Sequence, residues 1–206
     1  ELDALDITSL GQTAERVLAG IRKDGIEWDG YFDDSTSFEA YQAANLGSGT
    51  RVLSVFIGTT TGNIAYGAQT QLFAAALQMP GKAIVTASGA LRPDHTLERG
   101  AVIQPRVTAT GSSVSGSVDA GALNTGSGQW YLHVFSIGAG TTSTIALQDS
   151  ADGLTFADLA VQVISTSTAY RVSAGSGASG TIRQYTRLRW DGTGTKSIAS
   201  MVVRVA

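Results

Sequence analysis

Hydrophobic and polar residues alternate along residues 25–32 of the chain. One face carries Ile26, Trp28, Gly30 and Phe32, and the other carries Glu27, Asp29 and Tyr31. Successive side chains of a strand point to opposite faces of the sheet, so this period of two predicts a half-buried β-strand. The strand and the residues leading into it organise the first half of the chain.

Residues 8–24, which precede this strand, are mostly polar and show no period, so we predict a loop. Loops of about fifteen residues without structure of their own are uncommon inside compact domains and are often functional. The segment lacks the residue groupings that build a catalytic site. We therefore interpret it as a contact arm that reaches another subunit through its charged residues, which are Glu15, Arg16, Arg22, Lys23 and Asp24.

The remainder of the first half predicts one short helix and several strands. Residues 33–37 offer N-cap side chains, and apolar residues then recur at helical spacing before a Gly-Ser-Gly stop, which predicts a helix at 37–46. Strands are predicted at 51–57 and 82–90, and residues 64–79 predict either two strands or one long bent strand.

The second half predicts short strands at regular spacing, separated by turns rich in Gly, Ser and Asp. They cover residues 104–110, 129–137, 143–148, 157–164, 169–172, 181–190 and 197–205, with loops at 111–121 and 173–180. Such a series is typical of an antiparallel β-sandwich. Two stripes are predicted to face its core: Trp130, Leu132 and Val134, and Ile182, Leu188 and Trp190. Opposite the second stripe, a solvated face is predicted to carry Arg183, Tyr185, Arg187 and Arg189.

A polar, aperiodic stretch at residues 91–100 separates the two halves and contains Pro93. We interpret it as a linker, with a domain boundary near residues 99–104. The prediction is an all-β protein with one short helix, in which residues 1–100 form one domain and residues 101–206 form a second, immunoglobulin-like or jelly-roll-like sandwich.

Composition supports the all-β prediction. The 206 residues include 25 glycines, and only 15% are charged, which favours a turn-rich β-protein over a helical one. Cysteine is absent, which excludes disulfides and thiolate metal sites. No apolar run reaches the roughly 18 residues that a membrane-spanning helix needs, so we expect no membrane insertion.

The net charge of −3 is unevenly distributed. Residues 1–100 hold 12 acidic and 7 basic residues, whereas residues 101–206 hold 5 acidic and 7 basic residues. An acidic surface repels nucleic acid at close range, which argues against a DNA-binding groove in the first half. A surface past which DNA slides without sticking has the same balance.

Two groups of residues invite a metal-site interpretation. The histidines, His95 and His133, lack partners at ligand spacing, and we expect ordinary surface or sheet residues. Asp149, Asp152 and Asp158 resemble a calcium loop only superficially, because the glutamate at the twelfth position is missing. A turn between two strands explains these aspartates without an ion, so we expect no bound metal.

No residue pattern predicts catalysis. Asp33 and Asp34 are the only adjacent acidic pair, and their place before the predicted helix favours N-capping. Residues 111–116 lack the lysine and the glycine spacing of a phosphate-binding loop. Carboxylates that converge in space leave a hydrolase open as a distant third possibility. We expect a protein that is not an enzyme and has no catalytic residues and no cofactor.

One motif contains Asp6, Ile7, Thr8, Gly11, Thr13, Ala14 and Arg16 and continues with Gly20, Ile21 and Gly25. This order of residues resembles the major tail proteins, or tail tube proteins, of long-tailed bacteriophages. The resemblance extends through Gly30, Tyr31, Phe32 and Asp33, and residues 97–100 are similar to the motif that closes the tube domain in this family. Residues 148–159 and 183–190 resemble an additional sandwich domain that some of these proteins carry.

The resemblance implies a structural virion protein. In the family, sheets of six subunits join into a hexameric ring, rings stack into a tube through which DNA passes, and the loop before the long strand contacts the next ring. The family also has a strand or two before that loop, and we expect these to be missing here because the chain opens on Glu1. The second domain is expected to face outward.

The resemblance also implies partners and a location. The expected partners are further copies of the chain and other tail proteins such as the tape measure, tail terminator and distal tail proteins, with phage DNA only transiently in the lumen. The expected location is the phage tail, assembled in the cytoplasm of the bacterial host.

A second hypothesis is a virion-surface module in which the sandwich binds a glycan and the first domain oligomerises it. Exposed aromatic rings stack on sugars, and the candidates are Tyr131, Phe135, Tyr170 and Tyr185. The tryptophans, Trp28, Trp130 and Trp190, lie in strand patterns and are predicted to be core residues instead.

Overall fold

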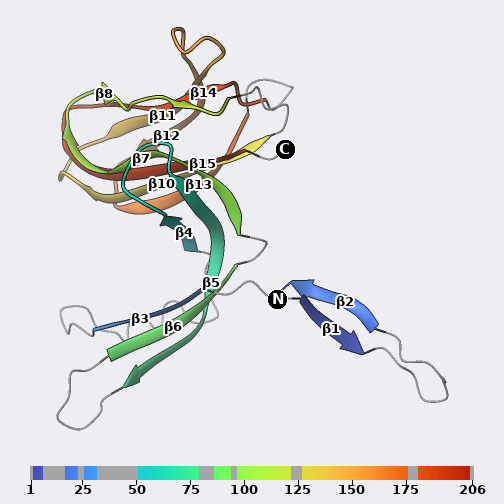
Figure 1. Ribbon diagram of the computed structural model, residues 1–206. Coiled ribbons are helices and arrows are strands. Elements are labelled where there is room, and N and C mark those ends of the chain that lie inside the picture. Colours follow the sequence, from blue (N-terminus) through green and yellow to red (C-terminus); the bar gives the residue numbers. More distant parts are fainter. Residues whose placement is uncertain are drawn as a thin grey trace. The chain divides into compact units, whose positions relative to one another are not determined.

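The computed structural model describes residues 2–6, 17–22, 26–31, 51–78, 86–93, 97–121, 127–175 and 181–204 (Figure 1). The regular structure of these residues consists of strands, so the fold is all-β as predicted. The predicted helix at 37–46, the pair Asp33 and Asp34, and His95 lie outside the described residues.

The strands follow one another along the chain with these bounds: β1 Leu2–Asp6, β2 Val17–Arg22, β3 Ile26–Tyr31, β4 Arg51–Phe56, β5 Ile64–Gln78, β6 Thr86–Pro93, β7 Glu98–Thr110, β8 Ser113–Val114, β9 Val118–Asp119, β10 Gly128–Ile137, β11 Ser143–Ser150, β12 Ala157–Ile164, β13 Thr168–Ala174, β14 Tyr185–Asp191 and β15 Thr195–Arg204.

The chain divides into two compact units that are discontinuous in sequence. Unit 1 contains Glu1–Arg51 and Thr70–Leu97, and unit 2 contains Val52–Gln69 and Glu98–Ala206. The division near residue 97 lies close to the predicted boundary. Residues 52–69 nevertheless belong with the second half of the chain, because β4 and the start of β5 pack with it.

Unit 1 contains two separate sets of paired strands. β1 and β2 form an antiparallel two-stranded ribbon in which Asp6 is paired with Val17. β6 lies between β3 and the C-terminal part of β5, antiparallel to both, with Trp28 opposite Gly89. Among the described strands, β3 therefore has a hydrogen-bonded neighbour on one side only.

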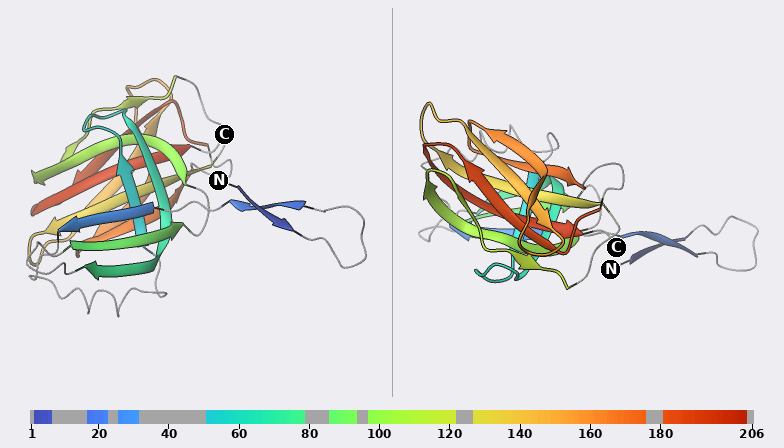
Figure 2. Two further views of the ribbon diagram at one scale, coloured as in Figure 1. Left: turned by 60° about the horizontal axis from the view of Figure 1, so that its bottom comes forward. Right: turned by 90° about the horizontal axis from the view of Figure 1, so that it is seen from above.

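Unit 2 is a sandwich of two antiparallel sheets. The first sheet, here called the inner sheet, has the order β13-β10-β15-β7 and continues into the start of β5, which also pairs with β4. The second, here called the outer sheet, has the order β12-β11-β14, and the short strands β8 and β9 both pair with β14. The long strands β7 and β15 lie side by side and are antiparallel, with register shifts near Ser200 (Figure 2).

A large apolar core fills the space between the two sheets. The predicted stripe on β10 faces it, and Trp130 and Leu132 are fully buried there. Leu188 and Ile145 enter the same core from the outer sheet. The one polar atom of the Trp130 ring is satisfied, because Nε1 donates a hydrogen bond to Ser200 Oγ at 2.8 Å.

A smaller core covers the opposite face of the inner sheet. Its buried members are Ala65, Val102, Tyr131, Met201 and Val203, against which Val52 and Phe56 pack. Because both faces of the inner sheet are covered, its central strand β15 is buried from Lys196 to Val203 instead of alternating. Continuous apolar character is the expected signature of a strand that is covered on both sides.

Most predicted strands are confirmed, and residues 64–78 form one long strand. The predicted loop at 8–24 is wrong for residues 17–22, which form β2. Their backbone pairs with β1, across ten intervening residues, and a local average of polarity does not detect such a partner. β1 lies before residue 8, where the predicted loop begins.

The predicted linker at 91–100 is wrong at both ends. β6 continues to Pro93 and β7 begins at Glu98, because β5 supplies backbone partners for both. Residues 111–121, predicted as a loop, include β8 and β9. The strand predicted at 181–190 begins only at Tyr185.

We expect Leu188→Ala to lower the free energy of unfolding by about 2–5 kcal/mol, because it removes a fully buried side chain and leaves a cavity between the sheets. Val163→Ala is the matched control, since Val163 is 57% exposed and its loss should change stability by about 0.5 kcal/mol or less. Urea unfolding followed by tryptophan fluorescence measures both. Equal losses for the two variants would contradict the assignment of this core.

Candidate functional site

On the face of the inner sheet that points away from the sandwich core, β10 carries three aromatic rings at alternate positions. Trp130, Leu132 and Val134 point into the sandwich core, so Tyr131, His133 and Phe135 lie on the other face of the inner sheet. Exposure increases along the row: Tyr131 is fully buried, His133 is partly buried, and Phe135 is 47% exposed. We treat this aromatic row as the candidate site of unit 2.

Tyr131 anchors the buried end of the row through a polar triad. Its hydroxyl donates a short hydrogen bond to the Glu98 carboxylate. Arg171 Nε donates to the Tyr131 hydroxyl at 3.0 Å, and Arg171 Nη2 contacts Glu98 Oε1 at 2.8 Å. Burial, followed by the bond to Glu98, raises the pKa of Tyr131, so the phenol stays protonated.

A glycine allows the Tyr131 ring to lie where it does. A Cβ atom placed on Gly67 would be 2.8 Å from the ring, closer than real Cβ contacts allow. Gly67 is on β5, opposite Glu98 of β7. The first residues of β5 thus pair with β7 and, at Gly67, leave room for the Tyr131 ring.

His133 is held neutral by its surroundings. Its Nε2 and the Ser54 hydroxyl share a hydrogen bond of 2.8 Å, which ties β10 to β4. Burial lowers the pKa of His133 from 6.5 to about 4. The imidazole is therefore uncharged at neutral pH and cannot act as a cation there.

Phe135 forms the exposed end of the row. A β-bulge between Val134 and Ser136 interrupts the register with β15 at this position. Bulges re-aim side chains, and this one accompanies the turn of Phe135 toward solvent. The ring stacks on His133 with centroids 6.3 Å apart, and Arg106 Cζ lies 4.6 Å from its centroid.

The four predicted glycan-facing aromatics do not form one site. Tyr131 is fully buried, so the prediction that it faces a glycan is wrong; β4 and β5 cover it. Tyr170 packs partly against the sandwich core, and Tyr185 lies on β14 in the other sheet. Phe135 is the one exposed aromatic among the residues whose side chains are described.

The predicted contact residues fall mostly outside the described part of the chain. Arg22 is the last residue of β2 and is paired with Leu2. Glu15, Arg16, Lys23 and Asp24 lie outside the described residues. Their role in subunit contacts stays a prediction.

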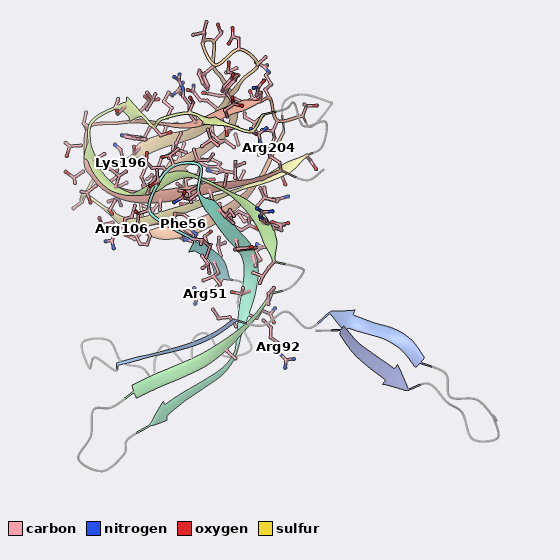
Figure 3. All side chains as sticks on the ribbon, in the orientation of Figure 1. Arg51, Phe56, Arg92, Arg106, Lys196 and Arg204 are labelled. Atoms are coloured by element: carbon pink, nitrogen blue, oxygen red, sulfur yellow. The ribbon has the colours of Figure 1, made fainter. Side chains whose placement is uncertain are left out.

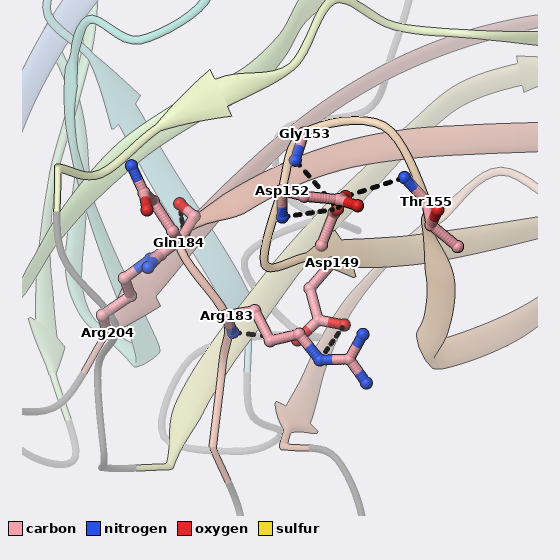
Figure 4. Close-up of polar contacts among 8 residues, drawn as sticks. Asp149, Asp152, Gly153, Thr155, Arg183, Gln184 and Arg204 are labelled. Carbon is pink, nitrogen blue, oxygen red and sulfur yellow. Dashed lines mark hydrogen bonds and ion pairs between the residues drawn. The ribbon is translucent and has the colours of Figure 1, made fainter.

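Asp149, Asp152 and Asp158 have separate partners, and Figure 4 shows those of Asp149 and Asp152. Asp149 is buried and accepts the Arg183 backbone N–H at 2.9 Å. Asp152 accepts the N–H groups of Leu154 and Thr155, both at 2.9 Å, and these bonds lower its pKa to about 2. Asp158 contacts other partners on the outer sheet. The described residues contain no group of side chains suited to a metal ion.

Two cationic side chains, Lys196 and Arg204, lie near the two ends of β15 (Figure 3). Lys196 is fully buried, and its Nζ donates to the carbonyl oxygens of Gly111 at 3.0 Å and Gly194 at 3.4 Å. Arg204 Nη2 donates to the Gln184 carbonyl at 2.9 Å. Burial lowers the pKa of both side chains, and their contacts with carbonyl groups indicate a structural role.

Comparisons with known proteins give little guidance. No family model matches the chain, and no curated protein matches it. Among solved structures, the chain is similar to the Dit (gp 19.1) protein of SPP1, described as a paradigm of the hub adsorption apparatus in phages that infect Gram-positive bacteria. The identity is 12%, the TM-score is 0.29, and the alignment covers 100% of this chain and 89% of the other. A TM-score of this size does not establish a common fold.

Sequence reasoning missed the triad around Tyr131. Glu98 and Arg171 are 73 residues apart, and each was part of a segment interpreted as polar linker or ordinary strand. Only the pairing of β13 with β10 places Arg171 opposite Tyr131.

The described residues include no helix with the length and hydropathy that a membrane crossing requires.

We expect a pH dependence of stability that originates from His133. Its pKa is lower in the folded state, so the unfolded chain binds more protons between about pH 6.5 and 4. The stabilisation is complete above pH 6.5 and is lost as the pH falls toward 4, by up to about 3 kcal/mol. Urea titrations of wild type and His133→Asn across this range measure it.

The variant should lack this component, so the two stability curves should converge as the pH falls. Carboxylates titrate in both proteins and cancel in the comparison. Curves that stay parallel from pH 7 to 4 would show that His133 does not titrate as its burial requires.

Proposed function

We propose that the chain is a structural protein of a bacteriophage tail that assembles with copies of itself. The copies close into hexameric rings, and the rings stack into a tube through which DNA passes. Unit 1 makes the ring contacts, and unit 2 is an accessory sandwich on the outside. The role is structural and not catalytic.

The observation that carries the proposal is that strand edges in unit 1 have no partner among the described residues. The β1–β2 ribbon pairs with no other described strand, and β3 is paired on one side only. An open edge presents unpaired N–H and C=O groups, which favour pairing with another chain. A lone two-stranded ribbon is marginally stable in water, so a partner strand would stabilise it.

A ribbon on one copy and an open β3 edge on the next are two different surfaces. A contact between different surfaces is head-to-tail, and head-to-tail contacts generate closed rings or open filaments. This geometry suits a protein that polymerises through its sheet edges. It also supports the interpretation of the N-terminal segment as a contact arm.

The motifs of the sequence support the same function. Those that resemble tail tube proteins, at residues 6–33 and 97–100, fall mainly in unit 1 and at the start of β7. The excess of acidic residues among residues 1–100 suits a lumen that DNA crosses without adhering. Tape measure, terminator and distal tail proteins are the partners that follow, and the virion is the proposed location.

Electron microscopy and sedimentation velocity of the full chain test the proposal. We expect rings or tubes of uniform diameter, with a mass that rises with concentration. Deleting residues 2–22 removes the ribbon and should leave a monomer, because the next copy then has no strand to accept. Leu154→Asp is the control, since Leu154 is 86% exposed in a turn of unit 2 and its change should leave assembly intact.

A wild-type protein that stays strictly monomeric at high concentration would contradict the proposal. Assembly that survives the deletion would show that other surfaces make the contacts. Circular dichroism of the deletion variant confirms that the remaining strands are folded, so that loss of assembly is not loss of structure.

A further inference from the structure

The outward face of the outer sheet carries a regular array of side chains in register. Three rows run across β12, β11 and β14: Asp158, Gln148 and Arg187; Val161, Ala146 and Arg189; and Val163, Thr144 and Asp191. The β12 lane is apolar apart from Asp158, and the β14 lane is charged. Val161 and Val163 are 49% and 57% exposed, so this lane faces solvent.

Arg189 engages both carboxylates of this face. Its Nη2 lies 3.2 Å from Asp158 Oδ2, and its Nε lies 3.1 Å from Asp191 Oδ2. Asp158 also accepts a hydrogen bond from Gln148 Nε2 at 2.7 Å. Both carboxylates of the array are therefore already in ion pairs with Arg189.

Arg187 is fixed in place without a carboxylate. Its Nε donates to Gln148 Oε1 at 2.9 Å, and its Cζ lies 3.9 Å from the centroid of the Phe156 ring. Gln148 is 4% exposed and is itself held by Asp158, so it is a rigid support. Within the described part of the chain, no carboxylate contacts Arg187, and its two Nη groups have no hydrogen-bond partner.

A guanidinium in this state is prepared to bind an oxyanion. Its planar fork matches the two oxygens of a carboxylate or phosphate group. The aromatic ring and the glutamine already restrict its rotamers, so less conformational entropy is lost on binding. The contact with the Phe156 ring leaves the outer N–H groups of the guanidinium free.

The surroundings of Arg187 favour a saccharide over a protein as the carrier of that anion. The exposed large apolar residues of β12 are the valines Val161 and Val163, not the aromatic anchors that dominate protein interfaces. Polar groups alternate with small apolar surfaces, as do the hydroxyl groups and C–H faces of sugar rings. The turn before Phe156 adds Leu154, which is 86% exposed.

We propose that the outward face of the outer sheet binds an acidic polysaccharide, with Arg187 holding a carboxylate or phosphate group of the polymer through its two Nη groups. Phe156 and Gln148 position the guanidinium, and the Val161–Val163 lane contacts neighbouring sugar rings. The site lies within unit 2 and does not depend on assembly of the chain. Loss of polysaccharide binding and loss of assembly can therefore be measured separately.

Isothermal titration of the full chain with three polymers tests the site. Polygalacturonate presents carboxylates, polyglycerol phosphate presents phosphates, and fully methyl-esterified polygalacturonate keeps the sugar backbone without the charge. We expect binding to at least one anionic polymer and none to the ester. The stronger of the two anionic polymers identifies the group that Arg187 prefers.

Arg187→Gln should weaken binding by about tenfold or more, because it removes the bidentate charge-assisted contact. Arg187→Lys should also weaken binding, since it keeps the charge but loses the planar fork. Arg51→Gln is the control for net charge: Arg51 is an exposed arginine of unit 1, and its loss should leave affinity unchanged.

Four outcomes would overturn the proposal: no binding to either anionic polymer, equal binding to the ester, unchanged affinity in Arg187→Gln, or equal binding to duplex DNA. A loss in Arg106→Gln instead would place the site at Phe135 on the inner sheet and would overturn it too. Matching urea midpoints for all variants exclude unfolding as the cause of a loss.

Discussion

Burial of the inner sheet of unit 2 on both faces is the constraint on which the rest of the structure depends. The outer sheet covers one face, and β4 with the start of β5 covers the other. A strand with two covered faces has no side on which polar groups meet water. Polar side chains buried there have partners: Trp130 donates to Ser200, and Glu98 accepts from both Tyr131 and Arg171.

The same constraint sorts the aromatic and charged residues by role. Rings that face a covered side, such as Tyr131, become anchors of the fold, and the ring that leaves it, Phe135, does so at a bulge. The outer sheet has a covered face and an open one, and its arginines lie on the open face. One of them, Arg189, is neutralised, whereas Arg187 is held rigid and remains available.

Local patterns predicted much of this architecture. The series of short strands separated by turns located β12, and the Trp130 and Leu188 stripes face the core as predicted. Failures occurred where a partner distant in sequence decides the outcome. β2 is a strand because β1 pairs with it, and Glu98 meets Arg171 only after β13 joins β10. No local spacing encodes that Gln148, Asp158 and Arg187 form one row, because the row exists only across three strands.

The chain passes between the two units three times, at residues 51–52, 69–70 and 97–98. No single proteolytic cut can therefore release a complete sandwich. A fragment starting at Glu98 would retain β10 of the inner sheet and β11 of the outer sheet. It would lose β4 and Ala65, which pack with Tyr131, Met201 and Val203 in the smaller core. Such a fragment would expose an apolar surface that favours aggregation. The boundary of unit 2 is therefore set by three crossings of the chain and does not coincide with one position in the sequence.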